Sequence, residues 1–201
     1  MCDYKIERKL LKQEYRYICG VDEVGRGALF GPVVSGAVIL NPGILNFKIK
    51  DSKKLCASKR LELAEDIYQH SLAYSVGWCW NDEIDCSNIL EATKKSMRRA
   101  VNKLQINPDY VLVDGLAPDF LNIKGEGIIK GDSKSLSIAA ASIIAKVFRD
   151  QLLIDFSKYY PEYDFEKNKG YPTQKHLNMV TLKGITEFHR KSFGWKNGKG
   201  K

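Results

Sequence analysis

The sequence contains few cysteines and histidines, and neither type is spaced to bind a metal ion. The five cysteines form no C-x-x-C pair, and the three histidines, His70, His176 and His189, are scattered along the 201 residues. A chain of this length can bury a core without disulfides, so we expect reduced thiols. Zinc modules and disulfide frameworks are excluded, and any metal ion must be bound by oxygen ligands.

Long hydrophobic runs are absent as well. The longest apolar stretch, Leu136 to Phe148, is interrupted by two serines and Lys146 and is too short to span a bilayer. The opening segment, MCDYKIERKLLKQEYRY, carries charges throughout and has no apolar region of the secretory type. We expect a soluble cytoplasmic protein that does not act at a membrane.

The composition is typical of a globular protein with surplus positive charge. Hydrophobic residues make up 44% and charged residues 28%, which excludes disorder and fibrous repeats. The net charge of +8 favours an anionic partner such as nucleic acid. The length suits one domain, residues 1–201, with a helical C-terminal portion at about residues 158–195 and a frayed basic tail at residues 196–201. We expect a monomer.

Hydrophobic patterning predicts an α/β fold with a mixed sheet. Short runs rich in Val and Ile, bounded by Gly and Pro, predict buried strands at residues 17–23, 33–40, 73–80 and 110–114. Helical spacing predicts helices at residues 58–70, 88–104 and 135–157, and another that begins at residue 173. The strands come first and then alternate with helices, which is typical of the α/β class.

Acidic residues stand at the ends of these predicted strands. Asp22 and Glu23 follow the apolar run ICGV, Asp114 follows YVLV, and Asp132 precedes the longest helix. Side chains at the carboxyl ends of strands in an open α/β sheet converge on the edge where ligands bind. The sequence therefore predicts that these four carboxylates gather in one site.

Such a cluster needs a cation. At about 5 Å and an effective dielectric constant near 20, each pair of like charges repels by roughly 3 kcal/mol, a large share of the stability of a domain. Oxygen-only ligands select Mg²⁺ or Mn²⁺. Two such ions about 3.5 to 4 Å apart are the usual arrangement for in-line displacement at phosphorus, so we expect two ions during catalysis.

Simpler interpretations stay open for these acids. Asp114 before Gly115 and Asp132 after Gly131 are also typical of turns and helix caps. Neighbouring residues of a strand point to opposite faces, so the adjacent acids at positions 22 and 23 share a site only if the strand ends or bulges there.

A glycine-rich loop follows the first two acids. Gly25, Arg26, Gly27 and Gly31 approximate a nucleotide-binding fingerprint, but the preceding acids would repel a pyrophosphate. The strand-like segment after Pro32 argues against an immediate helix. A hairpin with backbone amides exposed beside the acidic strand end fits better, and a glycine hairpin without a ligand is the alternative.

The ordered motifs resemble those of ribonuclease HII, the bacterial type 2 ribonuclease H family. They are GVDEVGRG at residues 20–27, DSKKL at 51–55, VDG at 113–115, KGDSKSLSIAAASIIAKVFRD at 130–150 and GYPTQKH at 170–176. The resemblance implies an RNase H-like fold: a mixed central sheet flanked by helices, with a helical C-terminal part. It also implies an endoribonuclease that cleaves the RNA strand of RNA–DNA hybrids, and duplex DNA at embedded ribonucleotides, leaving 5′-phosphate and 3′-hydroxyl ends.

Particular residues carry these implied roles. The family's metal-binding and catalytic carboxylates match Asp22, Glu23, Asp114 and Asp132, which would bind Mg²⁺ or Mn²⁺. Its substrate-binding positions match Gly25, Arg26, Gly27, Lys53 and Tyr171. In this family the glycine loop contacts the ribonucleotide through its backbone, and the tyrosine packs on the sugar and bonds the 2′-hydroxyl. That hydroxyl is the group that distinguishes RNA from DNA.

Some features depart from the family pattern or leave a role open. Ala28 and Phe30 stand where many relatives carry proline and a smaller residue, and the tail WKNGKGK shows no clamp-binding segment. Basic residues near the tyrosine, expected to contact phosphate, are Lys167, Lys169 and Lys175. Basic residues for which a solvated helix face is equally open are Lys94, Lys95, Arg98 and Arg99. We expect His176 to be structural or a phosphate contact, and His189 to lie at the surface or to be hydrogen-bonded.

Two other functions are consistent with the same motifs. One is another two-metal nuclease or polynucleotidyl transferase of the same fold, such as a junction resolvase, which would not need the 2′-hydroxyl. The other is a catalytically silent module that binds hybrids. The presence of all four carboxylates weighs against the silent module.

Overall fold

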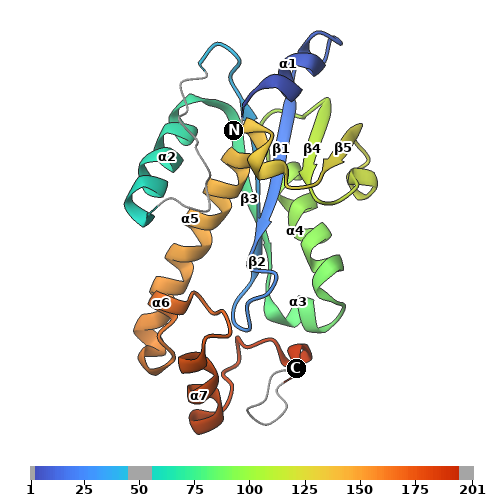
Figure 1. Ribbon diagram of the computed structural model, residues 1–201. Helices are drawn as coiled ribbons and strands as arrows, with labels where there is room; N and C mark the ends of the chain where they lie inside the picture. The colour runs from blue at the N-terminus through green and yellow to red at the C-terminus, as the bar shows by residue number, and fades with distance from the viewer. Residues whose placement is uncertain (1–2, 45–55, 195–201) are drawn as a thin grey trace.

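A five-stranded mixed sheet forms the centre of the computed structural model, which describes residues 3–44 and 56–194 (Figure 1). The strands are β1 (Ile18–Val24), β2 (Val33–Leu40), β3 (Ser71–Cys79), β4 (Tyr110–Asp114) and β5 (Gly125–Ile128). Their order is β3-β2-β1-β4-β5. β2 pairs antiparallel with β1 and β3, whereas β4 pairs parallel with β1 and β5. The predicted α/β class with a mixed sheet is confirmed.

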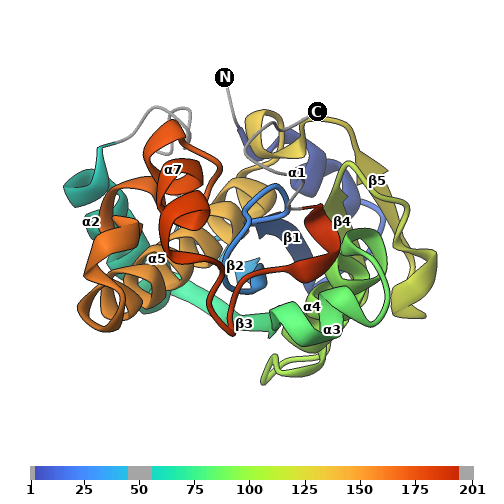
Figure 2. The ribbon, with the colours of Figure 1, turned by 90° about the horizontal axis from the view of Figure 1, so that it is seen from below.

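Helices cover both faces of this sheet. They are α1 (Lys5–Leu11), α2 (Ala57–His70), α3 (Asn81–Asp85), α4 (Ile89–Asn102), α5 (Leu136–Tyr159), α6 (Phe165–Asn168) and α7 (Gln174–Lys183). Short 3₁₀ helices are η2 (Pro118–Leu121), η3 (Gly131–Ser133), η4 (Pro161–Tyr163) and η5 (Lys191–Phe193). Figure 2 shows α2 and α5 on one side of the strands and α4 on the other. Each side has its own apolar cluster, so the strands are buried between two layers.

The predicted helix starts coincide with capping side chains. Asn88 Oδ1 accepts hydrogen bonds from the backbone N–H of Leu90 and Glu91, which begins α4. Ser135 caps α5 and Thr173 caps α7 in the same way. Side-chain acceptors of this kind satisfy donors that the first turn of a helix leaves open.

The strand β5 and the short helices α1, α3 and α6 were not predicted. β5 has the sequence GEGI, which lacks the alternation and the β-branched residues that mark a strand. It is held instead by parallel pairing with β4. The three helices have seven residues or fewer, too few for their periodicity to stand out.

The expectation of reduced thiols holds within the described residues. The cysteines there, Cys19, Cys56, Cys79 and Cys86, are free thiols. Although α5 has 24 residues, neither it nor any other described helix is both long and apolar enough to cross a bilayer.

The helix α5 packs closely against β1, the strand that ends in two of the acids. Ala139, Ala140 and Ala141 of α5 are fully buried, so the helix presents small side chains to the strands. A Cβ atom on Gly20 of β1 would overlap the backbone of Ser137. Only glycine at that strand position permits the helix to approach so closely.

The N-terminus of α5 is capped from another part of the chain. Glu7 of α1 is fully buried, and its Oε1 accepts hydrogen bonds from Ser135 Oγ at 2.6 Å and from the Ser137 backbone N–H at 2.9 Å. A carboxylate at this end also interacts favourably with the helix dipole. α1 therefore stabilises the helix start that follows Asp132.

We expect Glu7→Ala to lower the free energy of unfolding by about 1 to 3 kcal/mol, because it leaves two buried donors unpaired. Glu7→Gln keeps an acceptor oxygen and should cost less. Urea unfolding of the two variants and the natural protein measures the difference. Equal midpoints for Glu7→Ala and the natural protein would show that this cap contributes nothing.

Candidate active site

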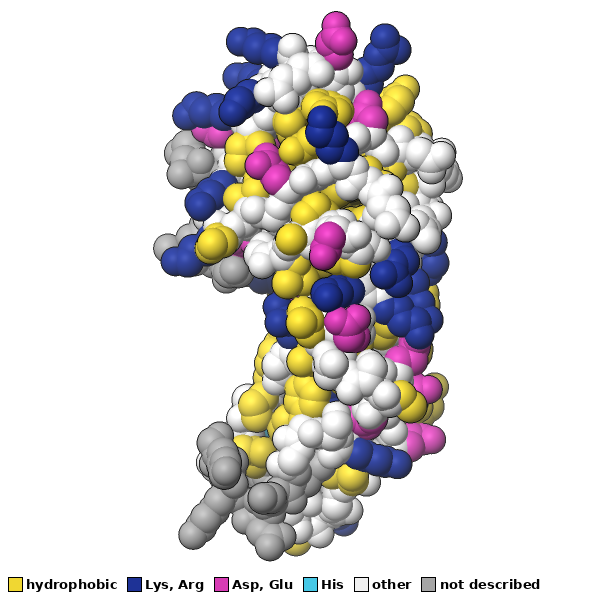
Figure 3. Space-filling model, turned by 90° about the vertical axis from the view of Figure 1, so that its right-hand side faces the viewer, with side chains coloured by type: hydrophobic (Ala, Val, Ile, Leu, Met, Phe, Trp, Pro, Cys, Tyr) yellow, Lys and Arg dark blue, Asp and Glu magenta, His cyan; other side chains and the backbone are white. Residues whose placement is uncertain are grey.

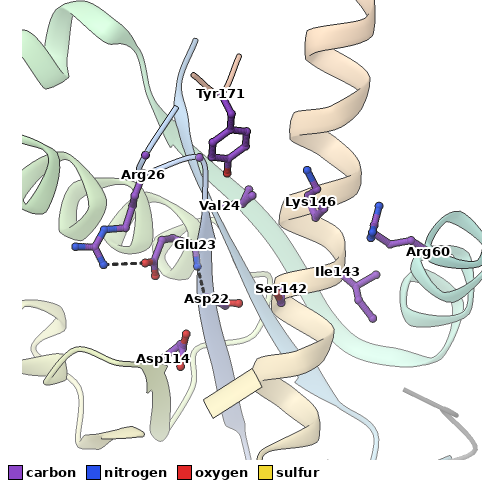
Figure 4. A pocket seen from close by; sticks show the side chains of 12 residues that line it. Asp22, Glu23, Val24, Arg26, Arg60, Asp114, Ser142, Ile143, Lys146 and Tyr171 are labelled. Carbon is purple, nitrogen blue, oxygen red and sulfur yellow. Dashed lines mark hydrogen bonds and ion pairs between the residues drawn. The ribbon is translucent and has the colours of Figure 1, made fainter. Parts of the chain in front are cut away.

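A pocket of about 400 Å³ lies at the carboxyl ends of β1 and β4, beside α5 (Figure 4). Its lining residues are Asp22, Glu23, Val24, Gly25, Arg26, Gly27, Arg60, Asp114, Ser142, Ile143, Lys146 and Tyr171. Parallel pairing sets Val21 beside Val113, so the acids that follow these two residues come from adjacent strand ends. The sheet topology thus brings together residues that are far apart in the sequence.

The adjacent acids of β1 leave the strand on opposite sides, as strand geometry requires. Asp22 points toward Ser142 of α5, whereas Glu23 points toward Arg26 (Figure 4). Asp22 is 4% exposed, and its Oδ1 accepts a hydrogen bond from the Glu23 backbone N–H at 2.7 Å. Glu23 Oε1 lies 3.1 Å from Arg26 Nη1. Both acids line one pocket because the pocket extends around the end of the strand.

Asp114 and Asp132 are connected through the turn that precedes α5. Asp114 Oδ1 accepts a hydrogen bond from the Gly131 backbone N–H at 2.6 Å. Asp132 follows in η3 and is 6% exposed, but it is not among the residues that line the pocket. Three of the predicted carboxylates therefore share the pocket directly, and the fourth is next in sequence to a residue that holds one of them.

Ionisation of the two acids on β1 is opposed by their surroundings. Burial raises the pKa of the Asp22 carboxyl well above its usual value, and the charge of Glu23 raises it further, whereas a hydrogen bond from Ser142 opposes the rise. Burial also raises the pKa of Glu23, against the opposing effect of Arg26. Without a cation, the carboxylate form of both side chains is disfavoured.

The donor atoms of this pocket fit a hard divalent cation. Glu23 Oε2 is buried and has no hydrogen-bond partner among the described residues, so it is an acceptor available to an ion. The acidic groups of the pocket offer only oxygen, which suits Mg²⁺ or Mn²⁺. In the described part of the chain, no three His, Cys, Asp or Glu side chains are already grouped to hold a metal ion. The carboxylates would have to draw closer as an ion binds.

Gly25 begins the glycine loop in a conformation that other residues rarely adopt. Its φ is +87°, and a Cβ atom there would lie 2.8 Å from Cδ and 2.9 Å from Cζ of Arg149. Arg149 is fully buried on α5. The loop and this arginine are therefore packed directly against each other.

The Arg149 guanidinium connects the glycine loop to the turn before Tyr171. It donates hydrogen bonds to the carbonyls of Phe30 at 3.0 Å, Pro32 at 3.0 Å and Lys169 at 2.8 Å. Its Cζ lies 5.5 Å from the centre of the Tyr171 ring. One buried cation thus holds both elements that the resemblance assigns to the ribose.

A second buried arginine holds the loop from its other side. Arg190 donates hydrogen bonds to the carbonyls of Arg26 at 2.8 Å and Gly31 at 3.0 Å. Burial lowers its pKa to about 9. Neither this arginine nor Arg149 was among the predicted site residues. Arg149 directly follows the largely apolar segment IIAKVF, and a charge at that place was a signal in the sequence. Its carbonyl partners, however, come from distant segments and could not be predicted.

The two departures from the family pattern fit the packing of this loop. Ala28 and Phe30 are both fully buried. The Phe30 ring stacks on Phe165 with ring centres 3.8 Å apart and meets the edge of Phe156. The large residue at position 30 anchors the loop to the C-terminal helices and removes no ligand.

Two cations in the pocket also went unpredicted. Lys146 Nζ lies 2.6 Å from Asp150 Oδ1, and Arg60 Nη1 lies 3.7 Å from Asp150 Oδ2. Asp150 therefore holds both cations at the side of the pocket opposite Asp114 (Figure 4). The i, i+4 spacing of Lys146 and Asp150 was the available sequence signal.

The structure separates the predicted basic groups. The helix α4 packs on the face of the sheet opposite α5, and there Lys94 pairs with Glu91, while Lys95 and Arg99 pair with Glu83. This placement favours the interpretation of a solvated helix face. Among the basic residues around Tyr171, Lys175 pairs with Asp164, and the contact of this group with phosphate stays a prediction. Lys53 lies outside the described residues.

Comparisons with known proteins agree with the motifs. The family profile named Ribonuclease HII matches residues 19–196. A ribonuclease HII from Caldicellulosiruptor saccharolyticus is 48% identical over 190 residues, 94% of this chain and 93% of the relative. The crystal structure of ribonuclease H2 from Pyrococcus horikoshii OT3 is similar with a TM-score of 0.76, at 27% identity, over 88% of this chain and 93% of that one. The structure of Bst-RNase HIII in complex with Mn²⁺ has the same fold, with a TM-score of 0.65 at 21% identity, over 84% of this chain and 63% of that one.

We expect Gly25→Ala to lower the free energy of unfolding by at least about 2 kcal/mol, because alanine is strained at positive φ and would displace the Arg149 guanidinium. Gly27→Ala is the matched control, since no atom lies within 4 Å of a Cβ at that position. Urea unfolding compares the two variants. Equal losses would show that the contact with Arg149 does not constrain the loop.

Proposed function

The chain belongs to the ribonuclease HII family, and from this premise we propose that its pocket cleaves RNA–DNA hybrids, and duplex DNA at embedded ribonucleotides, leaving 5′-phosphate and 3′-hydroxyl ends. The enzyme is an endoribonuclease that acts on RNA–DNA hybrids. The observation that carries the proposed chemistry is the single pocket that Asp22, Glu23 and Asp114 share with Tyr171 and the glycine loop. Acidic oxygens for a metal and groups that can contact a sugar are thereby adjacent.

The reaction depends on a metal, and we assign its binding to Asp22, Glu23, Asp114 and Asp132. Two Mg²⁺ or Mn²⁺ ions held there would supply a water molecule of lowered pKa and would stabilise charge on the phosphate. The carboxylates must lose their protons to bind, and the raised pKa values of Asp22 and Glu23 make that step dependent on pH. The role of Asp132 is assigned from its motif and from its place next to Gly131, whose backbone N–H donates to Asp114 Oδ1.

Recognition of the ribonucleotide is assigned to the other side of the same pocket. The backbone of Gly25, Arg26 and Gly27 borders the pocket, and the Tyr171 hydroxyl can face a sugar placed there (Figure 4). A protein must contact the 2′-hydroxyl if it is to distinguish RNA from DNA. Tyr171 is held from behind by Arg149, which keeps its ring in place without occupying the pocket.

Basic groups near the pocket provide contacts for the nucleic acid backbone. Arg60 and Lys146 line the pocket itself and are assigned to phosphates that flank the cleavage site. Figure 3 shows the surface hollowed between a broad upper part and a narrower lower part, with Lys and Arg side chains along the upper margin. A hollow with this charge is suited to a polyanion.

The decisive experiment is cleavage of a DNA duplex that contains one ribonucleotide, with Mg²⁺ and with Mn²⁺, against an all-deoxy duplex. We expect cuts only beside the ribonucleotide. Cleavage of the all-deoxy duplex at a similar rate would indicate a nuclease that does not read ribose. Binding without cleavage in either metal would indicate a silent module.

We expect Asp22→Asn to reduce cleavage by at least about a hundredfold, the scale for loss of one electrostatic group in an active site.

The same variant should be more stable than the natural protein in metal-free buffer at pH 8. The raised pKa means that the folded state holds the Asp22 proton more tightly than the unfolded state, so its contribution to stability declines as pH rises through the shifted value. Urea unfolding at pH 6 and pH 8 measures this. A variant less stable than the natural protein at pH 8 would contradict it.

We expect Lys146→Ala to weaken duplex binding and to reduce the slope of log affinity against log salt by about 1, the change for one lost phosphate contact. Lys94→Ala, on the opposite face of the sheet, is the control and should leave the slope unchanged. Binding titrations at several salt concentrations, without divalent metal, give both slopes. Identical slopes for the two variants would remove Lys146 from the phosphate contacts.

A further inference from the structure

Two histidines form a buried pair that the proposed chemistry does not use. His176 lies in the first turn of α7, and His189 lies in the segment that follows this helix. Both side chains are fully buried, and their Nε2 atoms are 3.0 Å apart. Burial excludes the predicted alternatives of a phosphate contact for His176 and a surface position for His189. Both histidines are structural and hydrogen-bonded.

The partners of this pair allow each proton to be assigned to one ring nitrogen. The Thr186 backbone N–H and the Thr186 Oγ1 both lie 2.9 Å from His189 Nδ1. Because the backbone N–H can only donate, whereas the hydroxyl can donate or accept, we assign no proton to this nitrogen. A neutral His189 then has its proton on Nε2 and donates it to His176 Nε2. His176 must in turn carry its proton on Nδ1, which lies 2.9 Å from the Tyr171 carbonyl. The hydrogen bonds therefore run in one direction, from Thr186 to Tyr171.

Adding a proton to either ring would break this chain of hydrogen bonds. A cationic His189 would direct an N–H at the Thr186 N–H, and a cationic His176 would direct an N–H at the N–H of His189. Burial lowers the pKa of His176, and burial together with His176 lowers the pKa of His189 to about 3. Both rings are accordingly neutral at the pH of ordinary assays.

The segment of His189 is also bonded to the glycine loop. Phe30 and His189 form an antiparallel bridge. The Arg190 backbone N–H donates to the Leu29 carbonyl at 2.9 Å, and the Gly31 N–H donates to the Phe188 carbonyl at 3.0 Å. His189 therefore stands between the loop on one side and the turn of Tyr171 on the other.

We propose that His176 and His189 are positioning residues that fix Tyr171 relative to the glycine loop, through a one-way hydrogen-bond relay in which His189 is the Nε2–H tautomer and His176 the Nδ1–H tautomer. The functional half of this proposal rests on the role of Tyr171 in reading ribose, proposed above. The tautomers themselves do not depend on it. The relay ends on the backbone of Tyr171, so a change in either histidine would move the tyrosine without touching substrate.

Nitrogen-15 NMR of the histidine side chains in the full chain at pH 7 tests the tautomers. We expect one buried ring with its proton on Nε2, assigned to His189, and one with its proton on Nδ1, assigned to His176. His176→Asn and His189→Asn identify the two signals by loss. The same tautomer in both rings, or a cationic ring at pH 7, would overturn the relay.

Two substitutions at position 176 test the positioning role. His176→Asn retains an N–H near the place of Nδ1 and can still donate to the Tyr171 carbonyl, whereas His176→Gln reaches toward His189 and loses that donor. Affinities for a duplex with one ribonucleotide and for an all-deoxy duplex are measured without divalent metal. We expect His176→Gln to reduce the ribo-to-deoxy preference by about fivefold, the effect of one hydrogen bond, and His176→Asn to reduce it less.

A folding defect would weaken binding of both duplexes alike and leave their ratio unchanged, which would overturn the positioning role. His70→Gln, at the end of α2, is the control and should alter neither affinity. If the natural protein shows no ribo-to-deoxy preference, the proposed reading of ribose fails instead, while the NMR result still decides the relay. A preserved ratio in His176→Gln alongside a clear preference in the natural protein counts against the positioning role alone.

Discussion

The ionisation of carboxylates in a buried place is the constraint on which the site depends. Asp22 is almost completely enclosed, and both its burial and the charge of Glu23 disfavour the carboxylate form. Hydrogen bonds from the Glu23 backbone N–H and from Ser142 compensate only in part. The proposed cation would supply the rest, so the same arrangement that costs stability in the metal-free chain would create affinity for a metal. Functional sites commonly carry local instability of this kind.

One face of α5 connects this acidic centre to the glycine loop and Tyr171, the elements proposed to read ribose. Ser142, Lys146 and Arg149 are spaced i, i+4 and i+7, so they lie in a row along the helix. The first hydrogen-bonds Asp22, the second lines the pocket, and the third holds the glycine loop and the turn of Tyr171. Seven residues of helix span about 10 Å. A rigid helix, itself packed on β1 and capped by Glu7, therefore sets the spacing between cleavage chemistry and sugar recognition.

The sequence was sufficient for the parts of this design that depend on local pattern. Runs of apolar residues predicted four of the five described strands, and helical spacing predicted the long helices, three of which begin at capping side chains. Because side chains at the carboxyl ends of neighbouring strands converge, Asp22, Glu23 and Asp114 were predicted to lie together, and all three line the pocket. The motif resemblance added Tyr171 and the glycine loop, which no periodicity could have joined. The family and fold that it implied are those of the chain.

What the sequence did not predict depends on contacts between distant segments. β5 exists because β4 offers it a partner, and Glu7 caps a helix that begins 129 positions later. His189 was expected at the surface or hydrogen-bonded, and its burial follows from packing against Phe30 and α7. Arg60 and Lys146 reach the pocket only because α2 and α5 lie side by side. None of these contacts between distant segments produces a repeat or a regular spacing in the sequence.

The buried side chains that donate hydrogen bonds around the glycine loop are a charged arginine and two neutral histidines, and this difference has a physical reason. An irregular loop leaves carbonyls that no strand ladder satisfies, and a buried carbonyl without a donor is costly. Where three carbonyls converge, at Phe30, Pro32 and Lys169, the planar fork of Arg149 meets all of them, and this geometry offsets the cost of burying its charge. Between Thr186 and Tyr171 the hydrogen bonds form a single chain. Two neutral histidines are sufficient to complete it, so no charge is buried. Arg149 thus holds the glycine loop and the turn of Tyr171 together, and the two histidines fix the same turn from its other side. In the proposed function these contacts would determine where a sugar lies relative to the acids.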